Sequence, residues 1–432
     1  MLIERAMTSV LRAISDRYAR LENIGQFIEV PPGDPAERLM LYLHVPFCVV
    51  LCPFCSFHRV RYQEAKARRY FDALRREIRM AHDAGFRFGE IYVGGGTPTA
   101  DAAELARTIE LARKLSPISR VSIETNPDDL VPERLRMLRD AGVDRLSVGV
   151  QSLDDSLLAE MQRREKYGNG DQIRTRLAAV QGMFDTLNVD LIFNLPHQSV
   201  ESIRRDIHIL TREIGVDQIS CYPLMGSRST RVAMKKDMGR VSYGREKQLY
   251  YDILEQLPAD YTPSSAWCFS RGDSVIDEYI TQHEDYIGLG SGAMSYLRGR
   301  LYAASFSINR YVRLIDSGHS GITRFSEFSE RDRMRYYFLM KLFSLKLNKA
   351  EAEARWGGRF ARTLWKDFAA FRLLGGIRDD GENWYLTRRG MYYWVLMMRE
   401  FFIAVSNFRD LMRLSIRSEL DPEDRADLPG AA

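Results

Sequence analysis

Apolar residues form two alternating kinds of segment over roughly the first 260 residues of the chain. Short apolar runs rich in β-branched residues recur six times, as is typical of buried strands. They occupy residues 39–45, 90–93, 120–124, 145–150, 188–193 and 218–222. Segments with helical periodicity lie between them, at residues 65–84, 102–115, 132–141, 172–184 and 202–213. Parallel strands need crossover connections that helices supply, so the pattern predicts an α/β fold, either a full or partial barrel or an open doubly wound sheet.

The pattern changes on both sides of this region. One expected helix at residues 3–21 and a Pro-rich turn at residues 30–35 precede it. Helical segments dominate after it and end in a wing-like strand at Trp384 and a long helix at residues 389–416. The predicted units are an N-terminal helical arm (1–38), the β/α barrel (39–260), a Gly-rich segment completing the site (261–326), a mainly helical, winged-helix-like C-terminal domain (327–418) and a disordered tail (419–432).

Composition narrows the class of protein. The formal charge of +4 is small for 432 residues and forms no long basic run, so we expect no nucleic-acid partner. The N-terminus has no apolar run typical of a secretory signal or membrane anchor, and we expect a cytoplasmic protein. Three of the five cysteines fall within eight positions, which favours a metal or cluster site over a disulfide framework.

Those three cysteines follow the first strand, in Tyr42-Leu-His-Val-Pro-Phe-Cys48-Val-Val-Leu-Cys52-Pro-Phe-Cys55. Thiolates are the usual ligands of iron-sulfur clusters. Three thiolates on a four-iron cluster leave one iron open to a small molecule. The alternative is a zinc loop whose fourth ligand is His44 or His58.

A second motif, Val93-Gly-Gly-Gly-Thr-Pro-Thr99, follows the second strand. Glycines let a ligand approach the backbone closely and leave N–H groups unshielded. Behind a cluster loop, this segment indicates a binding site for a small polar molecule, although a Gly triplet before Thr-Pro also suits a simple turn.

Together the two motifs resemble the radical S-adenosylmethionine (SAM) superfamily. The resemblance implies a partial (β/α)6 TIM-like barrel with a [4Fe-4S] cluster on Cys48, Cys52 and Cys55. It implies that SAM chelates the open iron and that an electron from the cluster yields a 5′-deoxyadenosyl radical. It also implies a reducing partner such as flavodoxin or ferredoxin.

Further residues resemble the oxygen-independent coproporphyrinogen III oxidase family, over residues 41–348. In that family the matching positions contact two SAM molecules in one site. Here these positions are Tyr42, Phe54, Gly95, Gly96, Thr97, Glu124, Gln151, Arg163 and Asp190. Met225 occupies another such position, although a methionine there also suits the core. The Gly-rich segment that ends in Met294 resembles the one that completes the family's SAM pocket.

Two departures from the family pattern bear on the reaction. Phe57 stands where the decarboxylating oxidase has a fourth cysteine. The segment at residues 263–270 lacks the His-Asn-x-x-Tyr-Trp element of the haem chaperones. The remaining branch is that of the methyltransferases, in which the second SAM donates a one-carbon unit to an unsaturated or aromatic carbon. Oxidative decarboxylation of a porphyrinogen and haem handling stay as alternatives.

The acceptor is predicted from the last helix. Its segment at residues 391–405 is rich in methionine and aromatic residues, and either packs in the core or forms a wall around a hydrophobic, planar substrate. Menaquinone, methylated on its ring, is our specific hypothesis, and a lipid substrate would bring the protein into peripheral contact with a membrane. In the decarboxylase alternative, Arg5, Arg12, Arg17 and Arg20 are candidate partners for propionates.

Methyl transfer also requires a group that accepts a proton. Tyr42 and His44 are the candidate catalytic residues, and Tyr286 is a further candidate. Cys221 lies in a predicted strand and is expected to be buried. Cys268 lies beside Trp267, close enough to the Gly-rich segment in sequence for a role near the substrate.

Overall fold

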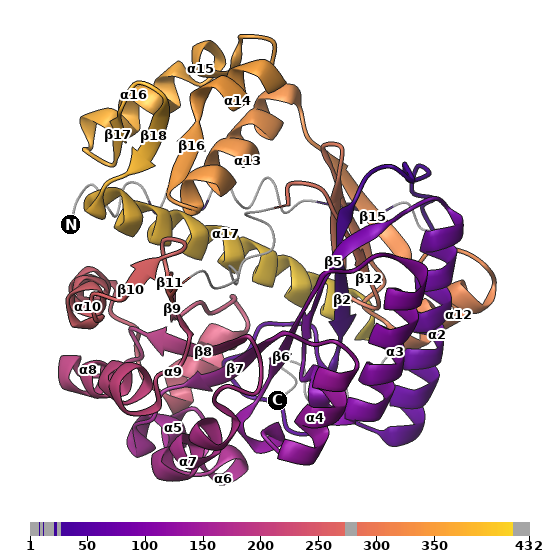
Figure 1. Ribbon diagram of the computed structural model, residues 1–432, viewed down its shortest axis with the longest axis horizontal. Coiled ribbons are helices and arrows are strands. Elements are labelled where there is room, and N and C mark those ends of the chain that lie inside the picture. The colour runs from indigo at the N-terminus through magenta and orange to yellow at the C-terminus, as the bar shows by residue number, and fades with distance from the viewer. Residues whose placement is uncertain (1–7, 9–11, 13–20, 24–26, 273–282, 418–432) are drawn as a thin grey trace.

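The computed structural model describes residues 8, 12, 21–23, 27–272 and 283–417 (Figure 1). Six neighbouring parallel strands form the centre of its main sheet. They are β2 (Leu39–Val45), β5 (Phe88–Gly95), β6 (Arg120–Thr125), β7 (Arg145–Gln151), β8 (Thr186–Phe193) and β9 (Gln218–Pro223). Each contains one of the six strands expected from the sequence, which confirms the parallel α/β fold.

Helices cover the outer face of these strands (Figure 1). They are α2 (Glu64–Asp83), α3 (Ala102–Leu115), α4 (Pro132–Asp140), α7 (Gly170–Val180) and α8 (Val200–His208). Helix α2 is amphipathic, since Ala67, Tyr70, Leu74 and Ile78 recur at helical spacing and are all buried. Helix α8 continues as a π-helical turn over Ile209–Ile214, which the periodicity did not predict.

The sheet continues on both sides, with antiparallel pairs beyond β12 on one side and beyond β9 on the other, and does not close. Strand β12 (Tyr286–Leu289) pairs in parallel with β2 and leads to β13 (Met294–Leu297), β14 (Arg300–Ala304) and β15 (Ile322–Glu327). On the other side, β11 (Cys268–Arg271) and β10 (Tyr261–Pro263) follow β9. The ends of the thirteen-stranded order are β1 (Glu22–Asn23) and β10, so the barrel is partial, as expected.

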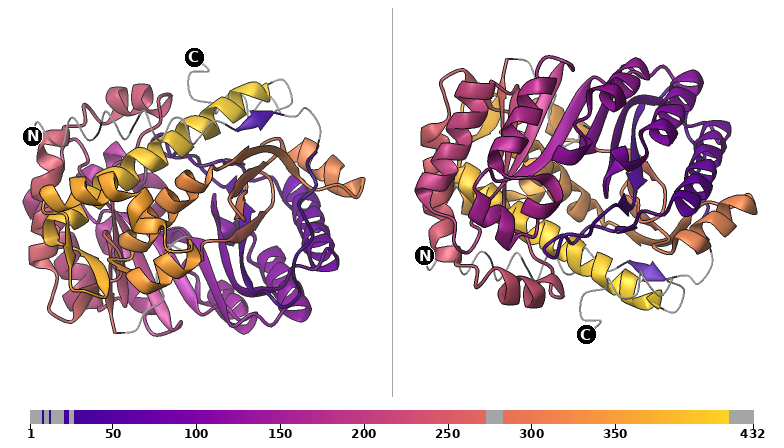
Figure 2. Two further views of the ribbon diagram at one scale, coloured as in Figure 1. Left: turned by 90° about the horizontal axis from the view of Figure 1, so that it is seen from above. Right: turned by 90° about the horizontal axis from the view of Figure 1, so that it is seen from below.

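The C-terminal region is mainly helical and carries a small sheet. Helix α13 (Glu330–Phe343) precedes a three-stranded sheet of β16 (Lys346–Asn348), β18 (Asn383–Leu386) and β17 (Ile377–Asp379). The wing-like strand at Trp384 is therefore confirmed. Helix α17 (Arg388–Ser415) then runs diagonally across one side of the molecule in both views of Figure 2. No described helix combines the length and apolar content needed to cross a bilayer.

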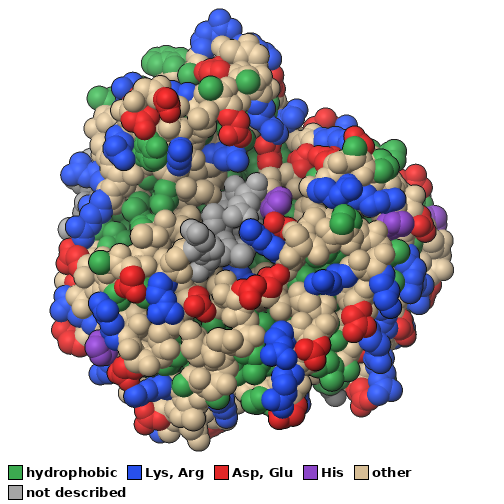
Figure 3. All heavy atoms as spheres, viewed as in Figure 1, with side chains coloured by type: hydrophobic (Ala, Val, Ile, Leu, Met, Phe, Trp, Pro, Cys, Tyr) green, Lys and Arg blue, Asp and Glu red, His purple; other side chains and the backbone are tan. Residues whose placement is uncertain are grey.

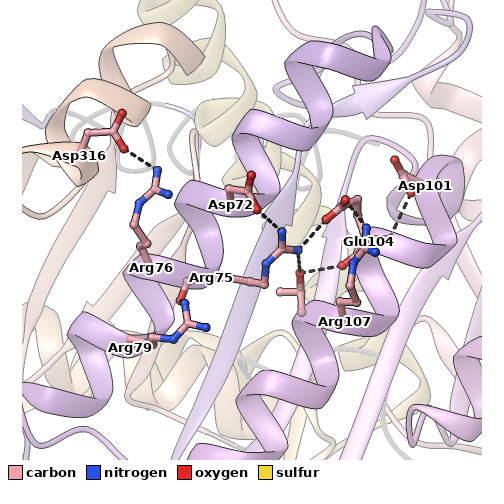
Figure 4. A network of polar contacts seen from close by, with 9 residues as sticks. Asp72, Arg75, Arg76, Arg79, Asp101, Glu104, Arg107 and Asp316 are labelled. Carbon is pink, nitrogen blue, oxygen red and sulfur yellow. Dashed lines mark hydrogen bonds and ion pairs between the residues drawn. The ribbon is translucent and has the colours of Figure 1, made fainter.

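Ion pairs join the helices outside the barrel (Figure 4). Arg75 of α2 contacts Glu104 of α3 at 2.7 Å, and Arg76 pairs with Asp316 at the end of α12 (Ile308–Asp316). The Arg76–Asp316 pair is exposed and contributes little to stability, whereas Arg75 and Glu104 are largely buried and hold α2 against α3. Acidic and basic side chains are interspersed over the face shown in Figure 3.

Candidate active site

A cavity of about 310 Å³ lies at the carboxyl ends of the parallel strands, where β/α folds place their chemistry. Most of the site residues expected from the sequence line it. They are Tyr42, Cys48, Cys52, Phe54, Cys55, Gly95, Gly96, Glu124, Gln151, Arg163, Asp190 and Met225. Residues that are far apart in the chain therefore meet around one space, as the resemblance implied.

The three cysteines face this cavity from one loop. The Thr97 hydroxyl lies 3.4 Å from Cys48 Sγ, and Arg163 Nη1 lies 3.5 Å from Cys52 Sγ. Burial raises the pKa of Cys48 to about 11, and the hydrogen bond from Thr97 opposes that rise. Binding of a metal would release the thiol proton.

The donor set fits a cluster better than a single ion. Within the described ranges, no three His, Cys, Asp or Glu side chains come close enough together to hold one metal ion. Thiolates that bind different irons of one cluster need not approach one another so closely. His44 is engaged elsewhere, because its Nδ1 lies 2.9 Å from Tyr42 Oη and its Nε2 lies 3.0 Å from the His58 carbonyl oxygen. These contacts count against a zinc loop completed by His44.

The glycine motif forms a cradle beside the thiols. Gly95 has a φ of +121°, and a Cβ there would lie 2.8 Å from His44 Cε1. A Cβ on Gly96 would lie 2.6 Å from the Phe47 carbonyl oxygen. Neither position has room for a side chain, so the backbone itself forms this wall of the cavity.

A chain of polar contacts connects the glycine loop to the cysteine loop. Asn126 Nδ2 donates to Thr97 Oγ1 at 2.8 Å, and Arg163 Nη2 donates to Asn126 Oδ1 at 3.3 Å. The chain therefore runs from Cys48 through Thr97, Asn126 and Arg163 to Cys52. It fixes the two loops relative to each other.

Two carboxylates face the cavity from β6 and β8, the strands on either side of β7. Glu124 accepts hydrogen bonds from Tyr92 Oη at 3.0 Å and from the Gly95 N–H at 3.1 Å. Asp190 accepts from Ser147 Oγ at 3.1 Å and from Asn188 Nδ2 at 2.8 Å. Both side chains are held in place by the barrel interior, as residues that bind a ligand require.

Gln151 lies at an irregular point of β7, where the register with β8 shifts. Its φ is +74°, in the left-handed region that non-glycine residues rarely adopt. Such a conformation costs about 1–3 kcal/mol and is found most often at functional sites. The bulge directs Gln151 toward the cavity.

The remaining walls are largely aromatic and apolar. Tyr222, Leu224 and Met225 lie at the end of β9, Trp267 precedes β11, and Phe402 belongs to α17. Most of the segment at residues 391–405 packs in the core, including Trp394 and Met398, and Phe402 is its one residue in the described lining. Ser406 and Arg409, further along α17, also reach the cavity.

Several residues singled out in the sequence do not line the cavity. Thr97 and His44 lie directly behind the lining residues, where Thr97 contacts Cys48 and His44 contacts Tyr42. Met294 packs instead against a buried apolar cluster that includes Phe408 and Met412 of α17, which counts against a contact with SAM. Tyr286 is buried and lies outside the lining.

The two remaining cysteines are also buried away from the cavity. Cys221 lies in β9, and burial raises the pKa of its thiol. Cys268 lies beside Ser220, whose Oγ is 3.6 Å from its sulfur, while its neighbour Trp267 faces the cavity. Cys221 is therefore the buried residue that we expected, and Cys268 has no direct contact with the site.

Other lining residues were missed by the sequence reasoning. Arg59, Asn126, Lys166, Trp267 and Arg409 all face the cavity. Arg59, Asn126, Lys166 and Trp267 lie within four residues of positions already singled out in the sequence, so their proximity to those positions was an available signal. Arg409 comes from a distant helix and offered no such signal. Phe402 also lines the cavity and lies in the segment at residues 391–405 that we considered as a substrate wall.

Comparisons with known proteins agree with this geometry. The family model for the radical SAM superfamily matches residues 42–210. The heme chaperone HemW of Mycobacterium tuberculosis (strain H37Rv) is 30% identical over 279 residues, which are 61% of this chain and 70% of that protein. The oxygen-independent coproporphyrinogen III oxidase of Escherichia coli (strain K12) is 28% identical over 392 residues, 83% of each chain.

A solved structure shows the same fold over most of the chain. The coproporphyrinogen III oxidase HemN of Escherichia coli, described as a radical SAM enzyme, superposes with a TM-score of 0.69 at 24% identity. The superposition covers 85% of this chain and 90% of that one.

Proposed function

This chain belongs to the radical SAM superfamily, in the family of oxygen-independent coproporphyrinogen III oxidase and HemW, and on that premise we propose a C-methyltransferase that uses two SAM molecules. Its acceptor would be an unsaturated or aromatic carbon of a hydrophobic molecule, with the menaquinone ring as our specific candidate. A reductant such as flavodoxin or ferredoxin would supply the electron.

The cavity residues suit this cofactor set. A [4Fe-4S] cluster on Cys48, Cys52 and Cys55 would supply the electron that cleaves one SAM, while a second SAM would supply the carbon. The carboxylates of Glu124 and Asp190 can hold an ammonium group or ribose hydroxyls. Arg163 can hold a carboxylate, and the Gly95 and Gly96 backbone allows a close approach.

The observation that carries the choice of substrate is the small number of basic side chains in the described lining, three of which already donate to backbone carbonyl groups. Arg163 donates to the Gly149 carbonyl oxygen, Lys166 to that of Val50, and Arg59 to those of Cys52 and Cys55. A buried substrate with several carboxylates needs a cationic partner for each.

Among the described lining residues, the one further basic side chain is Arg409, whose guanidinium lies 4.7 Å from the Phe57 ring centre. An uncharged or singly charged planar acceptor against the aromatic wall therefore suits the cavity better than a porphyrinogen does.

Tyr42 and His44 form a dyad that can take up the proton lost from the acceptor. The His58 carbonyl oxygen can only accept, so His44 Nε2 carries the hydrogen and Nδ1 accepts from the Tyr42 hydroxyl. Burial lowers the pKa of His44 to about 4, so its Nδ1 is unprotonated at neutral pH and can hold a transferred proton only transiently. Tyr42 faces the cavity and can receive a proton while passing its own to His44.

Oxidative decarboxylation of a porphyrinogen is the second candidate, and the relatives favour it over methyl transfer. Those relatives are an oxidase and a haem chaperone, and the oxidase match extends over 83% of each chain. Phe57, in place of a fourth cysteine, counts against it. So does Arg12, whose Nε pairs with Glu400 at 2.9 Å, while Arg5, Arg17 and Arg20 lie outside the described residues.

Product analysis separates these functions. The protein is reconstituted anaerobically with iron and sulfide, then given dithionite, SAM and either menaquinone or coproporphyrinogen III. Methyl transfer yields S-adenosylhomocysteine together with 5′-deoxyadenosine and adds one methylene to the mass of the quinone. Carbon dioxide release from the porphyrinogen without S-adenosylhomocysteine would instead establish the decarboxylase. Stoichiometric haem uptake with neither product would point to a chaperone.

A further inference from the structure

Arg59 is held rigidly behind the cysteine loop. It directly precedes β4 (Val60–Arg61), which pairs in parallel with β3 (Phe47–Cys48). The Val60 N–H donates to the Pro46 carbonyl oxygen at 2.7 Å, and the Tyr62 N–H donates to that of Cys48 at 2.9 Å. The Arg59 side chain is only 6% exposed although it lines the cavity.

The guanidinium of Arg59 has more donors than the loop uses. Nη2 donates to the Cys55 carbonyl oxygen at 2.9 Å and also to that of Cys52. Nε and Nη1 are buried and have no hydrogen-bond partner among the described residues. Burying unpaired guanidinium donors is costly, so a partner is expected where these groups point.

The neighbouring residues show which partner that is. Arg59 donates to the carbonyl groups of Cys52 and Cys55, and it lines the same cavity as all three cysteines. All three cysteines therefore lie within electrostatic reach of one buried cation. Arg163, by contrast, has only Nε without a partner, because its Nη groups already contact Cys52 Sγ, Asn126 and Gly149.

We propose that Arg59 donates its remaining N–H groups to the sulfur atoms of the cluster and thereby raises the cluster's reduction potential. This role rests on the cluster part of the proposed function and on neither choice of substrate. Reduction adds one negative charge to a cluster already ligated by three thiolates. A buried cation and N–H···S hydrogen bonds stabilise the reduced form more than the oxidised form.

The test is a potentiometric titration of the cluster followed by electron paramagnetic resonance, without SAM or substrate. Arg59→Gln keeps a donor for the loop carbonyl groups but removes the charge. We expect the ratio of reduced to oxidised cluster at a fixed applied potential to fall about tenfold, which is about 59 mV for one electron. Iron and sulfide content per chain are measured on the same samples.

Arg61→Gln is the matched control. Arg61 is exposed, lies two residues further along, and carries the same charge. We expect the ratio of reduced to oxidised cluster in Arg61→Gln to stay within about twofold of the ratio in the parent protein, since solvent screens exposed charges. An equal fall in both variants would mean that net charge alone sets the potential, and would overturn the proposal.

The remaining outcomes also decide the matter. Arg59→Gln with full iron content and an unchanged ratio would show that Arg59 only braces the loop. If Arg59→Gln loses its cluster, Arg59→Lys is titrated instead, because it keeps the charge but loses the guanidinium fork. In Arg59→Lys we expect the ratio of reduced to oxidised cluster to fall at least about threefold, and an unchanged ratio would overturn the proposal. A parent protein that binds no cluster would contradict the proposed function itself.

Discussion

Gly95 shows how closely single residues are constrained at this site. Its φ of +121° is unfavourable for alanine, and the added Cβ would lie only 2.8 Å from His44 Cε1. We expect Gly95→Ala to lower SAM cleavage at least about hundredfold by displacing the cradle and His44. The measurement is 5′-deoxyadenosine formed by reconstituted protein.

Gly89 in the same strand is the control for that variant. A Cβ there would lie 3.5 Å from Arg38 Cβ, an ordinary contact, and no positive φ is required. Gly89→Ala should cleave SAM at close to the parent rate. Equal activity of the two alanine variants would show that the cradle is not needed.

Tyr42→Phe tests the proposed proton transfer. The change removes only the hydroxyl that donates to His44 Nδ1 at 2.9 Å. Without it we expect methyl transfer to fall about hundredfold, the usual scale of general-base catalysis, while SAM cleavage continues. The ratio of methylated product to 5′-deoxyadenosine measures this, and a parallel loss of both would mean that Tyr42 serves SAM binding instead.

Site residues could be predicted from the sequence where they belong to a short motif of neighbouring residues. Cys48, Cys52, Cys55, Gly95 and Gly96 stand in short patterns whose chemistry can be read without a fold. Asn126 has no such pattern, because its bond to Thr97 exists only where the ends of β5 and β6 meet. The unused donors of Arg59 likewise appear only once its burial is known.

At the scale of elements, the six central strands were predictable because their apolar runs are nearly continuous. Strand β2 is buried along all seven residues, as expected for a strand covered on both faces. Boundaries were less predictable. The helix expected at residues 172–184 ends at Val180, where Gln181 leaves the helical conformation, and Gly182 follows with a φ of +75°.

Helix α17 was predictable as an element but not in its position. Its length follows from periodicity, whereas its contact with the barrel depends on distant partners. Arg399 is buried and pairs with Glu246 of α10 (Tyr243–Gln256) and with Glu400. This placement brings Phe402 to the cavity, whereas the local pattern indicated only the segment at residues 391–405 and not which of its residues would line the site.

Phe402→Ala tests the role of α17 as a substrate wall. Loss of the ring removes apolar contact area from the acceptor but leaves the SAM residues untouched. We expect the KM for the acceptor to rise about tenfold with little change in SAM cleavage without acceptor. The neighbouring Phe401→Ala, which does not line the cavity, should leave KM near the parent value; equal effects would indicate general destabilisation.

At the scale of the whole molecule, two buried carboxyl groups couple stability to pH. Glu77 of α2 accepts from the Gly290 N–H at 2.8 Å and from Tyr311 Oη of α12 at 2.7 Å. Burial raises its pKa to about 7. Asp206 of α8, which accepts from Ser152 Oγ at 2.7 Å, is likewise raised to about 7 by burial.

The folded state therefore holds these protons more tightly than the unfolded state, whose carboxyl groups titrate near pH 4. The free energy of unfolding should fall as pH rises from about 4 to about 7 and should then stay level. Glu77 alone should account for a fall of roughly 3 kcal/mol. Thermal unfolding of the cluster-loaded protein at several pH values measures this. Glu77→Gln should flatten the dependence, whereas Glu133→Gln, at an exposed position, should not. If the stability of Glu77→Gln depends on pH as strongly as that of the parent protein, the account is wrong.

The central claim is that one cavity brings three thiolates and a SAM cradle together for radical chemistry. Its most direct test is the yield of 5′-deoxyadenosine from anaerobically reconstituted, dithionite-reduced protein, beside a Cys48→Ala, Cys52→Ala, Cys55→Ala variant. We expect 5′-deoxyadenosine from the parent and none from the variant. Equal yields from both, or none from a parent that carries four irons per chain, would contradict the account.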